Sequence, residues 1–292
     1  MKITASMVKD LRTKTGAGMM DCKKALVEAE GDMDKAVDIL REKGLSQAAK
    51  KASRVAAEGA VVSAISEDGK TGTIVEVNCE TDFVGSNEDF RALAASIAQQ
   101  IIAVNPADVE ALLASDLNGK TVKDTVTEAV AKIGENISVR RFVRYESAEG
   151  KVYSYIHGGG KIGVLVKVKG GDDELGKDIA MQVAAANPSY LNRTEVPQAE
   201  IEHEKEVLAV EARNEGKPEK IIEKMVLGRI NKYYKEVCLV DQEFIKDGDL
   251  TIAKLLKSKN ADVLRFARFQ LGEGIEKKQD DLAAEVAKQL NQ

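Results

Sequence analysis

Apolar side chains recur at the spacing of an amphipathic helix three times within the first 43 residues. The runs are Met7, Val8 and Leu11; Met19, Cys22, Leu26 and Ala29; and Met33, Ala36, Val37 and Leu40. Gly16-Ala17-Gly18 separates the first two runs, Asp32 is placed to cap the third helix, and Gly44 is placed to end it. Residues 4–43 are therefore predicted to form a small three-helix bundle, followed by an Ala- and Lys-rich helical linker over 45–58.

Beyond residue 58 the pattern changes to short runs of β-branched residues that end at glycines, which is typical of β-hairpins. Two hairpins are predicted, one joining 60–65 to 73–79 and the other joining 152–156 to 164–168. Helical spacing predicts helices over 88–103, 107–114 and 121–132, before a strand over 137–145. The predicted class is α+β with antiparallel sheets.

The two hairpins belong to an internal repeat. Gly69–Val77 reappears 91 residues later as Gly160–Val168, but Leu93, Ile97 and Asn105-Pro106 return with an offset of only 82, as Leu175, Ile179 and Asn187-Pro188. The first copy therefore carries nine additional residues, which fall within Asn78–Asp89. A fold that closes without these residues in one copy does not need them in the other, so Phe83 beside Asp82 is a candidate probe for a partner.

The second copy has an insertion of its own. Arg141–Tyr145 is echoed by Arg265–Phe269 at an offset of 124, which adds about 42 residues to the second copy. Within the added segment, 198–213 and 218–235 have helical composition on either side of Gly216-Lys217-Pro218. We expect a helical hairpin over about 191–234 that either projects as an interaction arm or folds back over the sheet, and a final amphipathic helix over 280–290.

The composition is that of a globular protein, with 43% hydrophobic and 31% charged residues. No apolar run reaches the roughly 18 residues of a membrane span, and the first residues lack the apolar stretch of a secretion signal. Three scattered cysteines fit packed thiols in a reducing cytoplasm, where we expect the protein to act. The net charge of −5 argues against nucleic acid as the main partner, although residues 1–54 hold 12 Lys and Arg against 8 Asp and Glu.

Enzyme signatures fail in this chain. Gly69-Lys70-Thr71 and Gly119-Lys120-Thr121 look like the end of a phosphate-binding loop, but Ala64 and Ala114 stand where that loop needs its first glycine. The chain has two histidines, His157 and His203. They are far apart, and no Cys or His cluster has the spacing of a metal site. We therefore expect no metal, no cofactor and no covalent catalysis.

Two long segments resemble the signature sequences of the bacterial elongation factor Ts family. These segments are Thr15–Leu26 and Glu76–Val84. Further matching blocks follow in the family order, namely Ile133-Gly134-Glu135-Asn136, His157-Gly158 with Ile162–Val166, and Gly272–Lys277. On these motifs the chain is identified as a member of the family over essentially its whole length.

The resemblance implies an architecture that agrees with the reading of the residues. It implies an N-terminal three-helix module of ubiquitin-associated type, a core of two related subdomains, an inserted helical hairpin and a C-terminal helix. The corresponding bounds are 1–54 for the module with its linker, 55–146 and 147–279 for the two subdomains, and 280–292 for the C-terminal helix.

The resemblance also implies a function, which is guanine-nucleotide exchange on the GTPase elongation factor Tu without direct nucleotide binding. In the family, the loop that matches Thr81, Asp82, Phe83 and Val84 reaches the nucleotide domain of the GTPase. The positions that match Arg12, Met19, Met20 and Lys23 lie against a helix of that domain. Ile133, Gly134 and His157 match the core contact surface.

Each assignment has a plainer alternative. Met19 and Met20 could pack in the bundle core, Phe83 could fold back over its own helix, and His157 could serve only hairpin hydrogen bonds. The alternative function is a protein-binding or assembly module without exchange activity, and a nucleic-acid binder that uses the basic N-terminal residues is a third. The sequence leaves open whether the protein forms a homodimer or a two-plus-two assembly with the GTPase.

Overall fold

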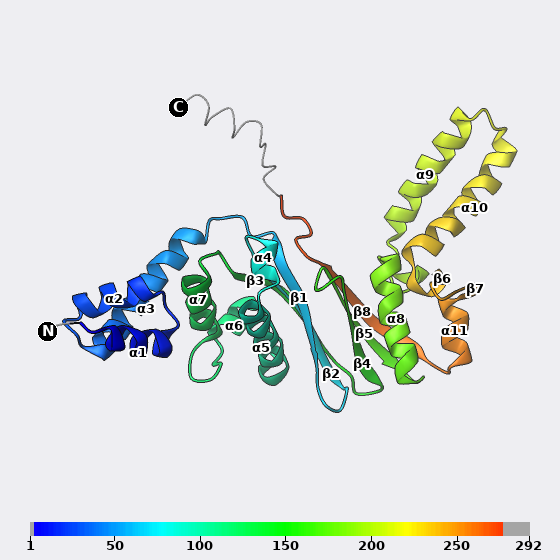
Figure 1. Ribbon diagram of the computed structural model, residues 1–292. Coiled ribbons are helices and arrows are strands. Elements are labelled where there is room, and N and C mark those ends of the chain that lie inside the picture. Colours follow the sequence, from blue (N-terminus) through cyan, green and yellow to red (C-terminus); the bar gives the residue numbers. More distant parts are fainter. Residues whose placement is uncertain (1–2, 277–292) are drawn as a thin grey trace, which may run out of the picture. The chain divides into compact units, whose positions relative to one another are not determined.

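The computed structural model describes residues 3–276, which form two compact units (Figure 1). Of the described residues, one unit holds 3–62, 75–142 and 270–276, and the other holds 63–74 and 143–269. The class is mixed, with helices and small antiparallel sheets, which confirms the predicted class. The helix predicted over 280–290 lies outside the described residues. Among the helices that the structure describes, none is long and apolar enough to cross a membrane.

Three helices open the chain: α1 (Ala5–Thr15), α2 (Met19–Glu28) and α3 (Met33–Lys51). The Thr4 hydroxyl accepts a hydrogen bond from Met7 N–H and caps α1. The Asp32 carboxylate accepts from two N–H groups and caps α3, which confirms the cap predicted at Asp32. The three helices enclose a core of their own, which consists of Val8, Leu11, Cys22, Ala25, Leu26, Ala29 and Ala36.

Gly44 does not end the third helix, so this part of the prediction was wrong. α3 continues through Gly44 to Lys51 and packs against α7 (Val122–Ile133). A Cβ atom at Gly44 would lie 3.2 Å from the Cβ of Ala131. The glycine therefore permits two helices to approach closely, and its place in the sequence reflects packing and not chain reversal.

The first sheet has the order β1-β2-β3, with β2 in the centre. Its strands are β1 (Glu58–Ile65), β2 (Thr71–Cys79) and β3 (Ser138–Glu146). The segment after β2 contains α4 (Asp82–Gly85), α5 (Glu88–Val104), α6 (Val109–Ala114) and α7, and α5, α6 and α7 pack on one another. Helix α4 falls in a segment predicted as loop, because one helical turn is too short to show a period.

The second sheet has the order β4-β5-β8, with β5 in the centre. Its strands are β4 (Lys151–His157), β5 (Ile162–Lys169) and β8 (Asp262–Gln270), and β4 pairs with β5 in antiparallel register, with Tyr153 opposite Val166. Helix α8 (Asp173–Ala186) packs on β4 and β5. Val164, Val166 and Val168 of the central strand, and Leu175 and Ile179 of α8, belong to the core between them.

Helices α9 (Gln198–Asn214) and α10 (Glu219–Val237) pack against each other and extend away from α8 (Figure 1). Near their base, the Tyr190 and Tyr233 hydroxyls both donate to the Glu200 carboxylate, and Arg193 pairs with Asp241 at 2.7 Å. The chain then forms a small hairpin of β6 (Glu243–Phe244) and β7 (Asp247–Thr251), which the sequence analysis did not predict, and α11 (Ile252–Ser258).

Candidate protein-docking site

Phe83 is presented to solvent on the short helix α4. Its side chain is 86% exposed, the largest value among the big apolar side chains that the structure describes. Asp82 beside it is also exposed, and no cation among the described residues pairs with its carboxylate. The alternative in which Phe83 folds back over its own helix is therefore excluded. A fully exposed phenyl ring gains free energy only when a partner covers it.

The N-terminal end of this turn is held by a carboxylate from a distant part of the chain. Oε2 of Glu135 accepts hydrogen bonds from Glu80 N–H at 3.1 Å and Thr81 N–H at 3.0 Å. Oε1 of Glu135 accepts from the Thr81 hydroxyl at 2.6 Å. The Thr81 hydroxyl also accepts from Val84 N–H at 3.3 Å and thereby caps α4. Thr81 and Val84 are thus half-buried supports, whereas Asp82 and Phe83 point to solvent.

The C-terminal end of the turn is fixed as well. The Arg91 guanidinium donates from Nε to the Gly85 carbonyl at 2.6 Å. A Cβ atom at Gly85 would lie 2.9 Å from the Gly59 carbonyl oxygen in β1, so the turn rests directly on strand backbone. Asn87 then caps α5 by accepting from Asp89 N–H at 2.9 Å. Both ends of the exposed turn are therefore bound to the body of the unit.

The segment Gly134–Asn136 joins this turn to the end of α3. Lys51 Nζ donates to the Gly134 carbonyl at 2.6 Å, and Asn136 Nδ2 donates to the Arg54 carbonyl at 2.8 Å. Asn136 N–H donates to the Glu80 carboxylate at 2.7 Å. Gly134 ends α7 with φ of 92°, a left-handed conformation that favours glycine. Sequence reasoning named Gly134 but missed its neighbour Glu135, although both lie in one family block.

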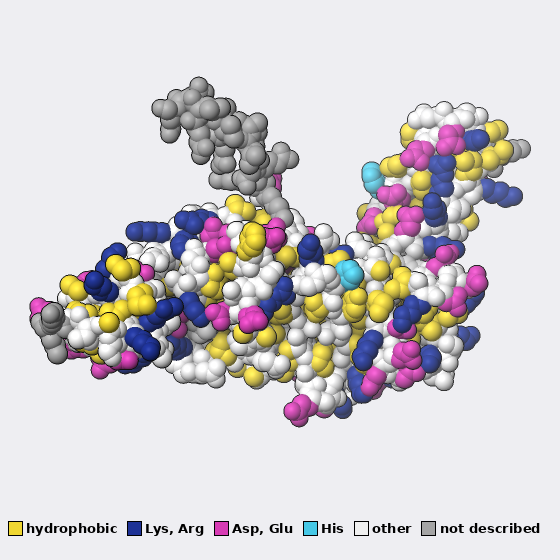
Figure 2. All heavy atoms as spheres, in the orientation of Figure 1, with side chains coloured by type: hydrophobic (Ala, Val, Ile, Leu, Met, Phe, Trp, Pro, Cys, Tyr) yellow, Lys and Arg dark blue, Asp and Glu magenta, His cyan; other side chains and the backbone are white. Residues whose placement is uncertain are grey.

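The predicted contact residues of the N-terminal helices lie at the surface. Met19 is 51% exposed and Met20 is 60% exposed, so the alternative in which both pack in the bundle core is excluded. Arg12 in α1 and Lys23 in α2 are also exposed. Figure 2 shows apolar and basic side chains mixed over these helices, and apolar side chains at the surface over α4. Flexible methionines beside cations suit contact with a protein surface.

The remaining predicted residues differ in setting. Ile133 is half-buried and Gly134 is exposed in the first unit, while His157 belongs to the second unit. His157 Nδ1 lies 3.1 Å from the Tyr155 hydroxyl, and its carbonyl accepts hydrogen bonds from Gly160 and Lys161. His157 thus serves the β4–β5 turn, as its alternative states, and its side chain is also exposed.

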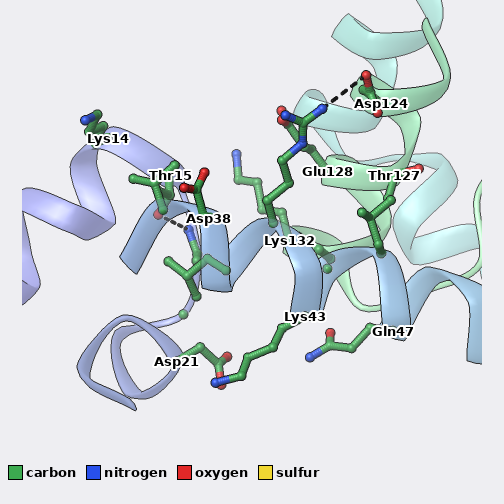
Figure 3. A pocket seen from close by; sticks show the side chains of 18 of the residues that line it. Lys14, Thr15, Asp21, Asp38, Lys43, Gln47, Asp124, Thr127, Glu128 and Lys132 are labelled. Carbon is green, nitrogen blue, oxygen red and sulfur yellow. Dashed lines mark hydrogen bonds and ion pairs between the residues drawn. The ribbon is translucent and has the colours of Figure 1, made fainter. Parts of the chain in front are cut away.

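A cavity of about 290 Å³ lies between the α1–α2 turn, α3 and α7 (Figure 3). Five cationic side chains line it, and each is paired with a carboxylate: Lys14 with Asp34, Arg41 with Asp124, Lys43 with Glu28, Lys120 with Glu128, and Lys132 with Asp89. Because these cations are already neutralised, the cavity lacks the excess positive charge that a nucleotide phosphate needs.

The three thiols are buried and show no sign of reactivity. Cys22, Cys79 and Cys238 have no exposed surface, and Cys79 Sγ donates to the Thr81 carbonyl at 3.1 Å. Burial, with the nearby Glu135 charge, raises the pKa of Cys79 to about 12. These are packed thiols, as expected. In the described part of the chain, no three His, Cys, Asp or Glu side chains group closely enough to hold a metal ion.

The described residues thus present an exposed aromatic ring on a turn that is hydrogen-bonded at both ends, and two exposed methionines on α2. Comparison with known proteins gives the family. The Elongation factor TS family profile matches residues 80–273. Elongation factor Ts of Clostridium perfringens is 56% identical over 98% of both chains, and those of Clostridium acetobutylicum and Clostridium botulinum are 55% identical over 99% of both chains. The chain belongs to the elongation factor Ts family, whose members are translation elongation factors that act as nucleotide exchange factors for elongation factor Tu.

Proposed function

We propose that this chain promotes GDP release from elongation factor Tu by inserting the Phe83 ring between helices of the nucleotide domain. The observation that carries the proposal is the 86% exposed Phe83 side chain on a turn that is hydrogen-bonded at both ends. Full burial of such a ring yields about 2 kcal/mol, with no loss for ordering a turn that is already ordered.

Exchange requires the factor to bind the nucleotide-free GTPase more tightly than the GDP form. The coupling is reciprocal: the protein lowers the affinity of the GTPase for GDP by the same ratio by which GDP lowers the affinity of the GTPase for the protein. About 5.5 kcal/mol of differential affinity would move a two-state balance from 1:99 to 99:1. One buried ring supplies less than half of this value, so a second contact area is needed.

The exposed side chains of Arg12, Met19, Met20 and Lys23 supply that second area in this proposal. They dock on a helix of the nucleotide domain, while Ile133, Gly134 and His157 contribute to the core contact surface. Asp82 then redirects hydrogen bonds near the Mg²⁺ and phosphate groups of the GTPase, because its carboxylate has no cation of its own among the described residues. The factor contributes contacts and no covalent chemistry.

We also propose that the core arose by duplication. Gln100 of α5 donates from Nε2 to the Asp116 carbonyl at 2.7 Å, and Gln182 of α8 donates to the Glu243 carbonyl at 3.1 Å. Equivalent buried amides that hold equivalent loops support two copies of one ancestral unit. The proposed bounds are 55–146 and 147–279, with the hairpin of α9 and α10 inserted at about 191–234.

The separate core of α1, α2 and α3 supports a module of ubiquitin-associated type over 1–54 in the same proposal. Its small size and its exposed methionines suit a docking module that adds affinity without touching the nucleotide site.

The test is stopped-flow release of a fluorescent GDP from elongation factor Tu. We expect the wild-type chain to accelerate release by orders of magnitude. The double variant Asp82→Ala, Phe83→Ala should reduce this acceleration at least about tenfold, because it removes the free energy that burial of the ring contributes. Leu227→Ala, which truncates a 66% exposed side chain on α10, is the matched control and should exchange normally.

Two other outcomes would redirect the interpretation. Normal exchange by the double variant would contradict the role of the α4 turn. A stable complex with unchanged GDP release would instead favour the alternative, a binding or assembly module.

A further inference from the structure

Glu135 makes hydrogen bonds to the turn that carries Phe83, although it is not among the residues proposed to contact the GTPase. Its carboxylate accepts from three donors, and all three belong to Glu80 and Thr81, more than fifty residues earlier in the chain. Glu135 is half-buried and bonds to the residues at the start of the turn, while Phe83 is exposed to solvent. Glu135 therefore acts on the exposed ring only through the backbone that carries it.

The position of the ring depends on the turn that carries it. Because Phe83 is 86% exposed, packing against its own unit cannot hold it in place. Its placement depends on the two ends of the four-residue turn, held by Glu135 at one side and by the Arg91 bond to the Gly85 carbonyl at the other. A turn released at one end would have to be ordered each time it entered the partner.

Glu135 also lies between two residues that are tied to the end of α3. Gly134 accepts from Lys51 Nζ, and Asn136 donates to the Arg54 carbonyl and to Glu80. The candidate contact segments at 81–84 and 133–134 are thus connected through one carboxylate and its neighbours. The two segments are therefore presented to a docking GTPase in a fixed position relative to each other.

We propose that Glu135 is a positioning residue for nucleotide exchange, which holds the Thr81–Val84 turn so that Phe83 enters the GTPase without reordering. This inference rests on the proposed function and adds a residue that does not itself touch the partner. The bonds need two polar atoms of a planar side-chain group at these positions and not a negative charge. A glutamine at 135 can accept from the two N–H groups through its oxygen and donate its amide to the Thr81 hydroxyl.

The first measurement is made on the free protein. Glu135→Ala removes the acceptor and should raise the amide hydrogen-exchange rate of Thr81 at least about tenfold. Glu135→Gln keeps an acceptor oxygen, so its Thr81 exchange rate should stay within about threefold of wild type. Glu128→Ala, which removes an exposed carboxylate from the preceding helix α7, is the matched control. Unchanged protection in Glu135→Ala would overturn the positioning role whether or not the chain is an exchange factor.

The second measurement is GDP release from elongation factor Tu as a function of factor concentration. Glu135→Ala should lower the maximal release rate about tenfold and change the half-saturating concentration less than about threefold, because the other docking residues remain. Glu135→Gln should restore the rate. Combining Glu135→Ala with Asp82→Ala and Phe83→Ala should add no further loss to the Asp82→Ala, Phe83→Ala variant, because Glu135 acts through the turn that carries both side chains.

Two results would overturn the proposal. One is a Glu135→Gln variant as slow as Glu135→Ala, which would make the charge and not the geometry responsible. The other is a fully additive loss when Glu135→Ala is combined with the Asp82→Ala, Phe83→Ala variant. If Glu135→Ala does not fold, the same two measurements are made on Arg91→Ala, which removes the hydrogen bond to the Gly85 carbonyl at the opposite end of the turn. A wild-type chain without any exchange activity would instead contradict the proposed function, and the hydrogen-exchange result would still decide the structural role.

Discussion

The connection between β2 and α5 differs from the connection between β5 and α8, although the elements on either side correspond. Asn105 and Asn187 end the two helices in the same left-handed conformation, each with φ of 46°. The first connection carries α4, and α5 has 17 residues where α8 has 14. The nine additional residues therefore build a short helix and one more helical turn.

The difference teaches which part of the first connection serves the fold. β5 and α8 pack well with only Gly170-Gly171-Asp172 between them, so a sheet and a helix of this kind need no longer link. The longer link places one ring in water and uses Glu135 and Arg91 to hold it there. The longer link is therefore the part of the first connection that the proposed function uses, because hydrogen bonds of the turn, and not packing of the ring, fix the position of Phe83.

The strongest test of the comparison exchanges the links. Replacing Glu80–Asn87 by Gly-Gly-Asp should reduce GDP exchange more than about 100-fold, because two or more contacts worth over 2.7 kcal/mol in total disappear. Phe90, which is fully buried in α5, is retained, and the new Asp can cap α5 as Asp172 caps α8. Circular dichroism and cooperative unfolding should show a folded chain. A variant that exchanges normally would contradict the functional reading of the link.

A second difference lies within the central strands, where Glu76 of β2 corresponds to Lys167 of β5. Glu76 is fully buried and accepts from Arg140 at 3.0 Å, Arg141 at 2.7 Å and Gly272 N–H at 2.8 Å. Lys167 donates to the Glu146 carbonyl near the surface. Removing one partner of such a buried pair leaves its charge uncompensated, so Glu76→Ala should lower the free energy of unfolding by about 3 kcal/mol, and Lys167→Ala by less than about 1 kcal/mol. Urea titration measures both.

Glu76 also makes the free energy of unfolding depend on pH. Burial alone would raise the pKa of Glu76, but the hydrogen bonds from Gly272 N–H and the two arginines outweigh it and hold the pKa below its ordinary value of 4.5. The stabilisation is therefore complete above pH 4.5 and is lost as the pH falls through the native pKa. Glu76→Gln should flatten this acid limb of the stability curve. An unchanged acid limb would contradict the assignment.

A smaller effect than that of Glu76→Ala is expected at a feature that the two copies share. Gln100 and Gln182 hold equivalent loops, so Gln100→Ala and Gln182→Ala should each lower the free energy of unfolding by about 1–2 kcal/mol, the value of a buried hydrogen bond and the carbonyl it leaves unpaired. Gln242, which accepts from Gln182 at 3.2 Å, makes the second site slightly more costly to change. A large loss at one site and none at the other would weaken the duplication proposal.

Many elements could be predicted from the sequence because their signals are local. The caps at Asp32 and Asn87 and the turns at Gly69 and Gly158 set boundaries within a few residues. Prediction failed at Gly44, where a contact with Ala131 decides the role of the glycine, and at α4 and β6, which are too short to show a period.

For the candidate site, the sequence singled out Asp82 and Phe83 but not the side chains that support them. The signal for Phe83 was a length difference between two copies, which is visible without a structure. Arg91 looks like any polar residue on a helix, and its bond to the Gly85 carbonyl depends on the path of the turn. Whether Met19 and Met20 faced the core or solvent could not be settled by periodicity, because both fit the first turn of α2.

The sequence by itself determined most of the helices and strands, the repeat and the position of the additional link, because these depend on spacing and on residues close along the chain. Only the tertiary structure decided that Glu135 closes on Thr81 across 54 residues, that Gly44 lies inside a helix contact, and that Phe83 stays in solvent. The physical reason is that a hydrogen bond or a close packing contact is fixed by the meeting of distant segments, and no local pattern records that meeting.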